Sequence, residues 1–255
     1  MSVPFSDDDL TCDGFLDGAL QIYQPSTGYR AATDPIFLAA ACPAHASQSV
    51  LELGCGVGTA SLALGKRVAD LRMIGVERQE NYAQLARRNA DNAALPLEVV
   101  VADLTTLSRH LTETFDHVMA NPPFFATGDG TWAKDAGREA ARREETGLND
   151  WISCAKKRLK PKGWLTLIHI AERLPEILAA LQAEKFGAIS ILPLQSRAGQ
   201  TAKRVVIRAR KLAKTPATLC PPFIIHAGAA HEKDGDDYSD AARAVLRQGA
   251  AINWP

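Results

Sequence analysis

From residue 49 onward, short apolar runs alternate with longer amphipathic stretches, and no other feature of the chain constrains its fold as strongly. Strands that alternate with helices are typical of a parallel sheet covered by helices. We expect strands at 49–53, 72–77, 97–101, 115–120, 164–170, 187–193 and 203–210. Helices are expected at 58–69, 79–93, 149–159 and 172–185.

The last two predicted strands are joined by the polar turn QSRAGQTA, which is too short for a crossover helix. Strands joined in this way pair antiparallel, so we expect a hairpin at the edge of the sheet. The predicted fold is therefore α/β, with a seven-stranded, mostly parallel sheet and an antiparallel C-terminal hairpin.

The chain has 255 residues and shows no internal repeat or low-complexity linker. One domain with terminal additions is therefore favoured over two small domains. Residues 1–48 are expected to form a lead-in of mixed loop and short helix, with its clearest helix at Pro35–Cys42. Residues 49–214 form the predicted core, and residues 215–255 a C-terminal extension packed on it, with a short helix at 239–248.

Charge and residue counts narrow the class of protein. The 29 basic and 29 acidic residues cancel, so a nucleic-acid partner would have to be held by a local patch. The five cysteines contain no C-x-x-C pair and the six histidines no H-x-x-x-H pair. These spacings predict neither disulfides nor a metal site, and the histidines are interpreted as surface or strand-end residues.

The chain begins with an acidic segment and contains no apolar run of about 18 residues. We therefore expect a cytoplasmic protein that does not enter a membrane. Residues 126–146 form a polar, glycine-containing stretch. Loops of this length are usually functional lids or disordered segments, and this one is predicted to lie over the site.

A glycine-rich turn, Glu52 to Gly58, joins the first core strand to the next helix. Gly54, Gly56 and Gly58 permit positive φ and let the backbone approach a ligand closely. The G-x-G-x-G spacing departs from the G-x-G-x-x-G of dinucleotide sites. Glu52 suits a cationic ligand, such as the ammonium group of S-adenosylmethionine, better than a phosphate. The alternative is a tight strand-to-helix turn without a ligand.

Polar residues also end the next strands along the chain. Glu77 ends the second strand, where its carboxylate is placed to accept hydrogen bonds from ribose hydroxyls. Asp103 follows the third strand, where it suits either an adenine amine or the N-cap of the following turn. The carboxyl edge of an open α/β sheet is where such folds bind ligands.

Asn121-Pro122-Pro123-Phe124 follows the fourth predicted strand. The Asn121 side-chain carbonyl and the Pro122 carbonyl can together accept both hydrogens of an exocyclic NH₂ group. The adjacent Phe124 ring offers a stacking surface for the base that carries the amine. The alternative reading is a turn that only ends the strand.

In these features the chain resembles the class I S-adenosylmethionine-dependent methyltransferases that carry an N-P-P-[FY] motif. It further resembles the bacterial tRNA(Val) adenine-37 N6-methyltransferase family. The matching features outside the core are Gln24-Pro25, Gly28-Tyr29-Arg30, Thr33-Asp34, the polar insertion after Phe125, Ile225-His226 and Tyr238-Ser239.

The resemblance implies a Rossmann-like fold and S-adenosylmethionine as cofactor. It implies that catalysis involves Asn121, Pro122, Pro123 and Phe124. It also implies a set of cofactor-binding residues, namely Glu52, Gly54, Gly56, Gly58, Glu77, Arg78, Asp103, Leu104 and Asn121. A second aromatic, Phe125, and Trp132 in the polar loop leave open which ring stacks the base.

The expected reaction is methylation of an exocyclic base amine, adenine N6 in a tRNA anticodon loop, where the base is easily unstacked. Alternatives within the class are ribosomal RNA guanine-N2 and protein glutamine methylation. A non-catalytic RNA-binding factor and a nicotinamide dehydrogenase are alternatives from other classes. Candidate RNA contacts are Arg138, Arg142, Arg143, Lys156, Lys157, Arg158, Lys160, Lys162, Arg204, Arg208, Arg210, Lys211 and Lys214. The sequence leaves the oligomeric state open.

Overall fold

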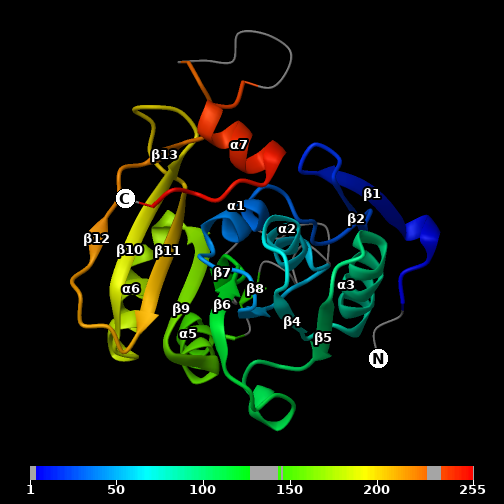
Figure 1. The fold of residues 1–255 in the computed structure, drawn as a ribbon, viewed down its shortest axis with the longest axis horizontal. Coiled ribbons are helices and arrows are strands. Elements are labelled where there is room, and N and C mark those ends of the chain that lie inside the picture. The colour runs from blue at the N-terminus through cyan, green and yellow to red at the C-terminus, as the bar shows by residue number, and fades with distance from the viewer. Residues whose placement is uncertain (1–3, 127–142, 145, 229–236, 255) are drawn as a thin grey trace.

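A computed structural model describes residues 4–126, 143–144, 146–228 and 237–254 (Figure 1). Within these residues the main element is a nine-stranded sheet in the order β12-β10-β11-β9-β6-β3-β4-β5, with β13 also paired to β10. Its strands are β3 (Ser49–Leu53), β4 (Arg72–Glu77), β5 (Leu97–Val101), β6 (Phe115–Ala120), β9 (Leu159–Ile170), β10 (Phe186–Gln195), β11 (Arg204–Lys211), β12 (Thr218–Leu219) and β13 (Phe223–Ile224).

All seven predicted strands are present, and their pairing confirms the predicted α/β fold class. Strands β5, β4, β3, β6 and β9 pair in parallel, whereas β11 pairs antiparallel with both β9 and β10. The two shortest strands, β12 and β13, were not predicted and extend the sheet beyond β10. Every residue of β3 is buried, as expected for a strand with helices on both faces.

Helices cover both faces of the sheet (Figure 1). Two separate clusters of buried apolar side chains mark these faces. The first face carries α1 (Asp34–Ala41), α2 (Thr59–Arg67) and α3 (Glu80–Ala93), with α7 (Asp240–Gln248) packed on α1. The other face carries α5 (Leu148–Arg158) and α6 (Leu174–Ala183). Single 3-10 turns lie at η1 (Asp7–Asp9), η2 (Leu107–Arg109) and η3 (Ala171–Arg173).

The predicted stripe on α3 is buried, and it includes one polar residue. Tyr82, Leu85, Ala86 and Asn89 all lie against the rest of the protein. Asn89 is fully buried, but its amide donates to the Tyr23 and Val57 carbonyls and its oxygen accepts from the Tyr23 N–H. Because the amide and the carbonyl oxygen of Asn89 both have hydrogen-bond partners, Asn89 connects α3 to the N-terminal segment at little desolvation cost.

The prediction of mixed loop and short helix for residues 1–48 is wrong for part of that segment. Strands β1 (Leu10–Phe15) and β2 (Leu20–Pro25) form an antiparallel hairpin. In β2 the apolar residues Leu20 and Ile22 are buried while Gln21 is exposed, whereas β1 alternates only between half-buried and exposed residues. The hairpin is held by its packing on α3, a tertiary contact that local sequence does not display.

The C-terminal residues pack on the same side as the N-terminal ones. Ser239 caps α7 by accepting a hydrogen bond from the Ala242 N–H at 3.1 Å, and the Ile252 N–H donates to the Ala40 carbonyl in α1. None of the helices in the described ranges is both long and apolar enough to cross a membrane.

Candidate active site

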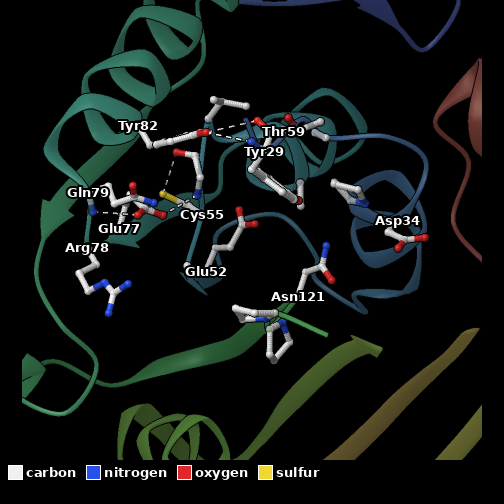
Figure 2. A pocket seen from close by; sticks show the side chains of 18 of the residues that line it. Tyr29, Asp34, Glu52, Cys55, Thr59, Glu77, Arg78, Gln79, Tyr82 and Asn121 are labelled. Carbon is white, nitrogen blue, oxygen red and sulfur yellow. Dashed lines mark hydrogen bonds between the residues drawn. The ribbon is translucent and has the colours of Figure 1, made fainter. Parts of the chain in front are cut away.

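A cavity of about 710 Å³ lies where the carboxyl ends of the parallel strands meet (Figure 2). The structure brings almost all predicted site residues to its wall. Those that line it are Glu52, Gly54, Gly56, Glu77, Arg78, Asp103, Leu104, Asn121, Pro122, Pro123 and Phe124. Gly58 does not line the cavity; it is the N-cap of α2, and a Cβ there would lie 3.2 Å from Leu97.

The glycine turn adopts the conformation that its sequence predicts. Gly54, Gly56 and Gly58 have φ values of +65°, +54° and +86°. A Cβ on Gly54 would lie 2.6 Å from the Trp151 ring, whereas one on Gly56 would come no closer than 3.6 Å to Tyr29. The first glycine is therefore required by packing as well as by its backbone angle.

Two carboxylates beside this turn are almost completely buried. Glu52 is 4% exposed, and its Oε2 accepts from the Ser61 N–H at 2.9 Å and the Ser61 hydroxyl at 2.5 Å. Burial raises the pKa of Glu52 to about 7, although the Ser61 bonds oppose this shift. Burial destabilises the charged form of this carboxylate, and a positively charged ligand would stabilise that form.

Glu77 holds the turn from the neighbouring strand. Its Oε2 accepts from the Gly56 N–H at 3.0 Å and its Oε1 from the Gln79 N–H at 2.8 Å. Burial raises its pKa, against the effect of these bonds. Each carboxylate oxygen has a second lone pair, so the bonds to Gly56 and Gln79 leave capacity for ligand hydroxyls.

Asp103 has the second of the two roles predicted for it, because it caps the turn after β5. Its Oδ1 accepts from the Thr105 N–H at 2.8 Å and the Thr105 hydroxyl at 2.5 Å, which fixes the turn after β5. The hydroxyl bond lowers the pKa of Asp103, so its carboxyl group stays ionised. Asp103 and Leu104 both line the cavity, at the end opposite to Asn121 in the sheet order.

Asn121 follows β6, which lies beside β3 in the sheet. Figure 2 shows its side chain in the cavity close to Glu52. Its Oδ1 is buried and has no hydrogen-bond partner among the described residues. A buried carbonyl oxygen without a partner is costly, and a ligand N–H would remove that cost.

The N-terminal segment supplies another wall of the cavity, formed by residues 28–35. The Tyr29 N–H donates to the Tyr82 hydroxyl at 3.2 Å, and Arg30 forms a 2.5 Å ion pair with Asp13 in the hairpin. Composition and periodicity did not predict a functional role for this segment. Its role was indicated by the resemblance of Gly28-Tyr29-Arg30 and Thr33-Asp34 to the tRNA methyltransferase family.

Sequence reasoning gave no site role to Trp151, which lines the cavity, or to His169, which lies beside Phe124, and it named Arg204 only as a candidate RNA contact. The Arg204 guanidinium lies 4.5 Å from the centre of the Phe124 ring, and its Nε donates to Asp34 at 3.0 Å. The His169 ring meets Phe124 edge-on, with ring centres 5.4 Å apart. The end of β9 and the start of β11 lie at the same sheet edge, which only the pairing reveals.

The interpretation of the histidines as surface or strand-end residues is wrong for His117 and incomplete for His169. His117 lies within β6 and is 3% exposed, and His169 lies near the end of β9 but is fully buried. Burial lowers the pKa of each to about 4, so both are neutral at physiological pH.

Much of the predicted polar loop lies outside the described residues. This applies to 127–142 and 145, and so to Trp132, Arg138 and Arg142. The described ends of the loop form a short parallel pair, β7 (Phe125–Ala126) with β8 (Arg143–Glu144).

Several of the basic residues proposed as RNA contacts around the end of α5 have partners within the protein. Lys211 donates to the Lys156 and Leu159 carbonyls, Arg158 to the Leu111 carbonyl, and Lys160 pairs with Asp116 at 2.9 Å. These bonds give the three side chains a structural role at the end of α5, which weakens their candidacy as RNA contacts. In the tail, His226 and Tyr238 form an antiparallel bridge, and the His226 ring contacts Asp237 at 2.6 Å. None of these residues lines the cavity.

The sheet order and the cavity at its carboxyl edge define a class I, Rossmann-like methyltransferase. A solved structure from Agrobacterium tumefaciens, described as a predicted O-methyltransferase, matches with a TM-score of 0.69 and 26% identity over 86% of this chain and 98% of its own. The Thermus thermophilus 16S rRNA N2 G1207 methyltransferase, solved with AdoMet and guanosine, shares the fold, with a TM-score of 0.53 and 21% identity over 79% and 50% of the two chains.

Sequence comparison then places the chain in a family. The methyltransferase small domain model matches residues 33–192, and the chain belongs to this family of S-adenosylmethionine-dependent methyltransferases. It is 29% identical to the tRNA1(Val) (adenine(37)-N6)-methyltransferase of Aeromonas hydrophila over 76% of this chain and 82% of the relative. It is 32% identical to the protein of the same name from Porphyromonas gingivalis, over 66% and 69%.

Proposed function

We propose that this enzyme methylates the N6 amine of adenine in a tRNA anticodon loop. One observation carries the proposal: the buried Oδ1 of Asn121 has no hydrogen-bond partner among the described residues and lies beside Pro122 at the wall of the cavity. The names of the relatives from Aeromonas hydrophila and Porphyromonas gingivalis support the choice of substrate. An enzyme with this substrate is expected to act in the cytoplasm.

The residues at the β3–β4–β5 end of the cavity fit S-adenosylmethionine. At Gly56 the turn leaves room for close approach, and Glu52 has the buried carboxylate that a cationic ligand stabilises. Glu77 would accept from the ribose hydroxyls and Asp103 from the adenine amine, with Arg78 and Leu104 alongside. When bound, the cofactor supplies an electrophilic methyl group carried on a sulfonium.

The residues at the Asn121 end would activate the acceptor amine. The lone pair of adenine N6 is delocalised into the ring, so the free base is a poor nucleophile. Asn121 Oδ1 and the Pro122 carbonyl each accept one N6 hydrogen, which draws the nitrogen toward tetrahedral geometry and directs its lone pair into the cavity. As N6 takes the methyl group, the methyl–sulfur bond would break and leave neutral S-adenosylhomocysteine. Because the neutral amine reacts, no base is needed beforehand, and N6 would release one proton to water after the new bond forms.

Phe124 would stack on the target base, which must leave its own stack to enter the cavity. An anticodon loop meets this requirement at low cost because its bases are unpaired. Residues 49–214 are proposed to carry both ligands, with residues 1–48 closing one wall. Guanine N2 and a glutamine amide also present a planar NH₂ group, so they are the alternatives that the experiment must separate.

The experiment incubates the enzyme and labelled S-adenosylmethionine with total tRNA from cells that lack the gene, followed by nucleoside analysis. The proposal expects label in N6-methyladenosine at one anticodon-loop position. Parallel incubations with ribosomal RNA and with protein from the same cells test the alternatives. Label in N2-methylguanosine or in protein there, without label in tRNA, would reject adenine as the target. Binding of the tRNA should weaken steeply between 50 and 200 mM salt, because Lys and Arg contacts to phosphate release counterions.

A further inference from the structure

His169 is a buried polar residue beside the Asn121–Phe124 segment to which the proposed mechanism assigns no part. Its Nε2 lies 3.2 Å from the Pro123 carbonyl oxygen, and its Nδ1 lies 2.9 Å from the Ile170 N–H. Both ring nitrogens are therefore engaged with backbone atoms, one of them in the N-P-P-F segment.

These two contacts determine where the imidazole carries its proton. The Ile170 N–H can only donate, so Nδ1 must be the unprotonated nitrogen. Nε2 then carries the hydrogen and donates it to the Pro123 carbonyl. Burial, together with the nearby charges of Arg173 and Arg204, lowers the pKa of His169 to about 4, although the bonds with Pro123 and Ile170 oppose this shift. The neutral tautomer is thus fixed across the physiological range.

The two prolines leave few soft torsions between Asn121 and Phe124. Each proline ring fixes its own φ near −65°. Asn121 and Pro122 both precede a proline, which restricts their ψ angles as well. The ψ angle of Pro123 is the torsion that no proline restricts, and it sets the direction in which the chain enters Phe124.

We propose that His169 is a positioning residue for the Asn121–Phe124 end of the cavity: by holding the Pro123 carbonyl, it fixes the one backbone torsion between Asn121 and Phe124 that no proline restricts, and so the direction from which the Phe124 ring enters the site. A second contact supports this role. The rings of His169 and Phe124 meet edge-on at 74°, with Arg204 over the Phe124 ring. This inference rests on the proposed function, in which Phe124 stacks on the target base.

Two variants of His169 separate the hydrogen bond from general packing. In His169→Gln the amide Nε2 reaches the position of the imidazole Nε2 and keeps a donor for the Pro123 carbonyl. In His169→Asn the side chain ends near the position of Nδ1, which keeps an acceptor for Ile170 but removes the donor. We expect kcat for tRNA methylation to fall about tenfold in His169→Asn and to return to within about threefold of the native value in His169→Gln. The affinity for S-adenosylhomocysteine should be unchanged in both.

A second readout needs no RNA. Protein labelled with 4-fluorophenylalanine gives a ¹⁹F resonance for Phe124, assigned by its loss in Phe124→Leu. The resonance should shift and broaden in His169→Asn and keep its native position in His169→Gln. If native protein fails to methylate tRNA but this pattern is seen, the proposed function fails and the positioning role stands. If tRNA is methylated but His169→Asn leaves kcat and the Phe124 resonance unchanged, the positioning role is overturned.

Discussion

The two ends of the cavity are built in different ways. The proposed cofactor end lies where the neighbouring strands β3 and β4 finish. There Glu77 accepts a hydrogen bond from the Gly56 N–H, and Glu52 accepts one from a backbone N–H of α2. At the proposed acceptor end, around Asn121, the Phe124 ring packs against Arg204. Arg204 in turn bonds to Asp34, which lies 170 residues earlier in the chain. The first end is a property of a local motif, whereas the second exists only after the whole sheet has formed.

The sharpest test of this division is Asn121→Ala. Removing the amide should reduce methyl transfer roughly 10²–10³-fold, since one preorganised hydrogen-bond partner of a reacting group is lost. The cofactor end should be untouched, so calorimetry should show native affinity for S-adenosylhomocysteine. The thermal unfolding midpoint should not fall, because the deleted oxygen has no partner among the described residues.

Single-turnover rates would measure the chemical step of Asn121→Ala directly. Near-native turnover would remove Asn121 from the mechanism. A parallel loss of cofactor affinity would show instead that the two ends are coupled, which contradicts the division drawn from the contacts.

The second test acts at the cofactor end and compares two glycines. Gly54→Ala and Gly56→Ala both place a Cβ at positive φ, but only Gly54→Ala brings it to 2.6 Å from Trp151. Both variants carry the same kind of backbone strain, so the difference in their stability measures the clash with Trp151. We expect Gly54→Ala to lose about 2 kcal/mol more stability than Gly56→Ala, while both variants lose cofactor affinity.

Urea unfolding and calorimetry on the two glycine variants give both quantities. Equal losses of stability in the two variants would mean that Trp151 moves freely and that the packing of α5 against the glycine turn is unimportant.

The same division explains what sequence could predict. Strands β3 to β6 were placed from local apolar runs, and Glu52, Glu77 and Asp103 followed because strand ends in such a sheet meet at one edge. The β1–β2 hairpin was missed because its stability comes from packing on α3. The positions of His169 and Arg204 beside Phe124 were not predicted because β11 inserts between β9 and β10, a pairing that no local pattern specifies.

The third test uses pH and the variant Glu52→Gln. Burial raises the pKa of Glu52 from 4.5 to about 7, so its carboxylate is charged above pH 7 and protonated below. Affinity for the cationic cofactor should fall about tenfold as pH drops from 8 to 6 in the native protein. In Glu52→Gln the affinity should be low at both pH values and nearly independent of pH. Calorimetric titration at each pH measures this.

Glu52→Gln should also stabilise the ligand-free protein at pH 8. A buried acid with a raised pKa disfavours folding while it is charged, and this penalty disappears as pH falls from about 7 to 4.5. The gain is at most about 3 kcal/mol at pH 8 and vanishes below the unfolded pKa. A Glu52→Gln protein that is less stable at pH 8 would show that the Ser61 bonds outweigh desolvation.

The smallest expected effect is at Arg204, where the acceptor end meets the N-terminal wall. Arg204→Lys keeps the charge beside Asp34 but loses the planar group over Phe124, whereas Arg204→Gln keeps a planar amide and loses the charge. If Phe124 needs a flat partner, Lys should raise KM for tRNA about three- to fivefold and Gln less, with kcat nearly native in both. If charge alone matters, the order reverses. Either order should leave cofactor affinity unchanged, because the contacts of Arg204 with Asp34 and Phe124 in the described part of the chain lie at the acceptor end. A loss of cofactor affinity would mean that Asp34 and Arg204 also shape the cofactor end.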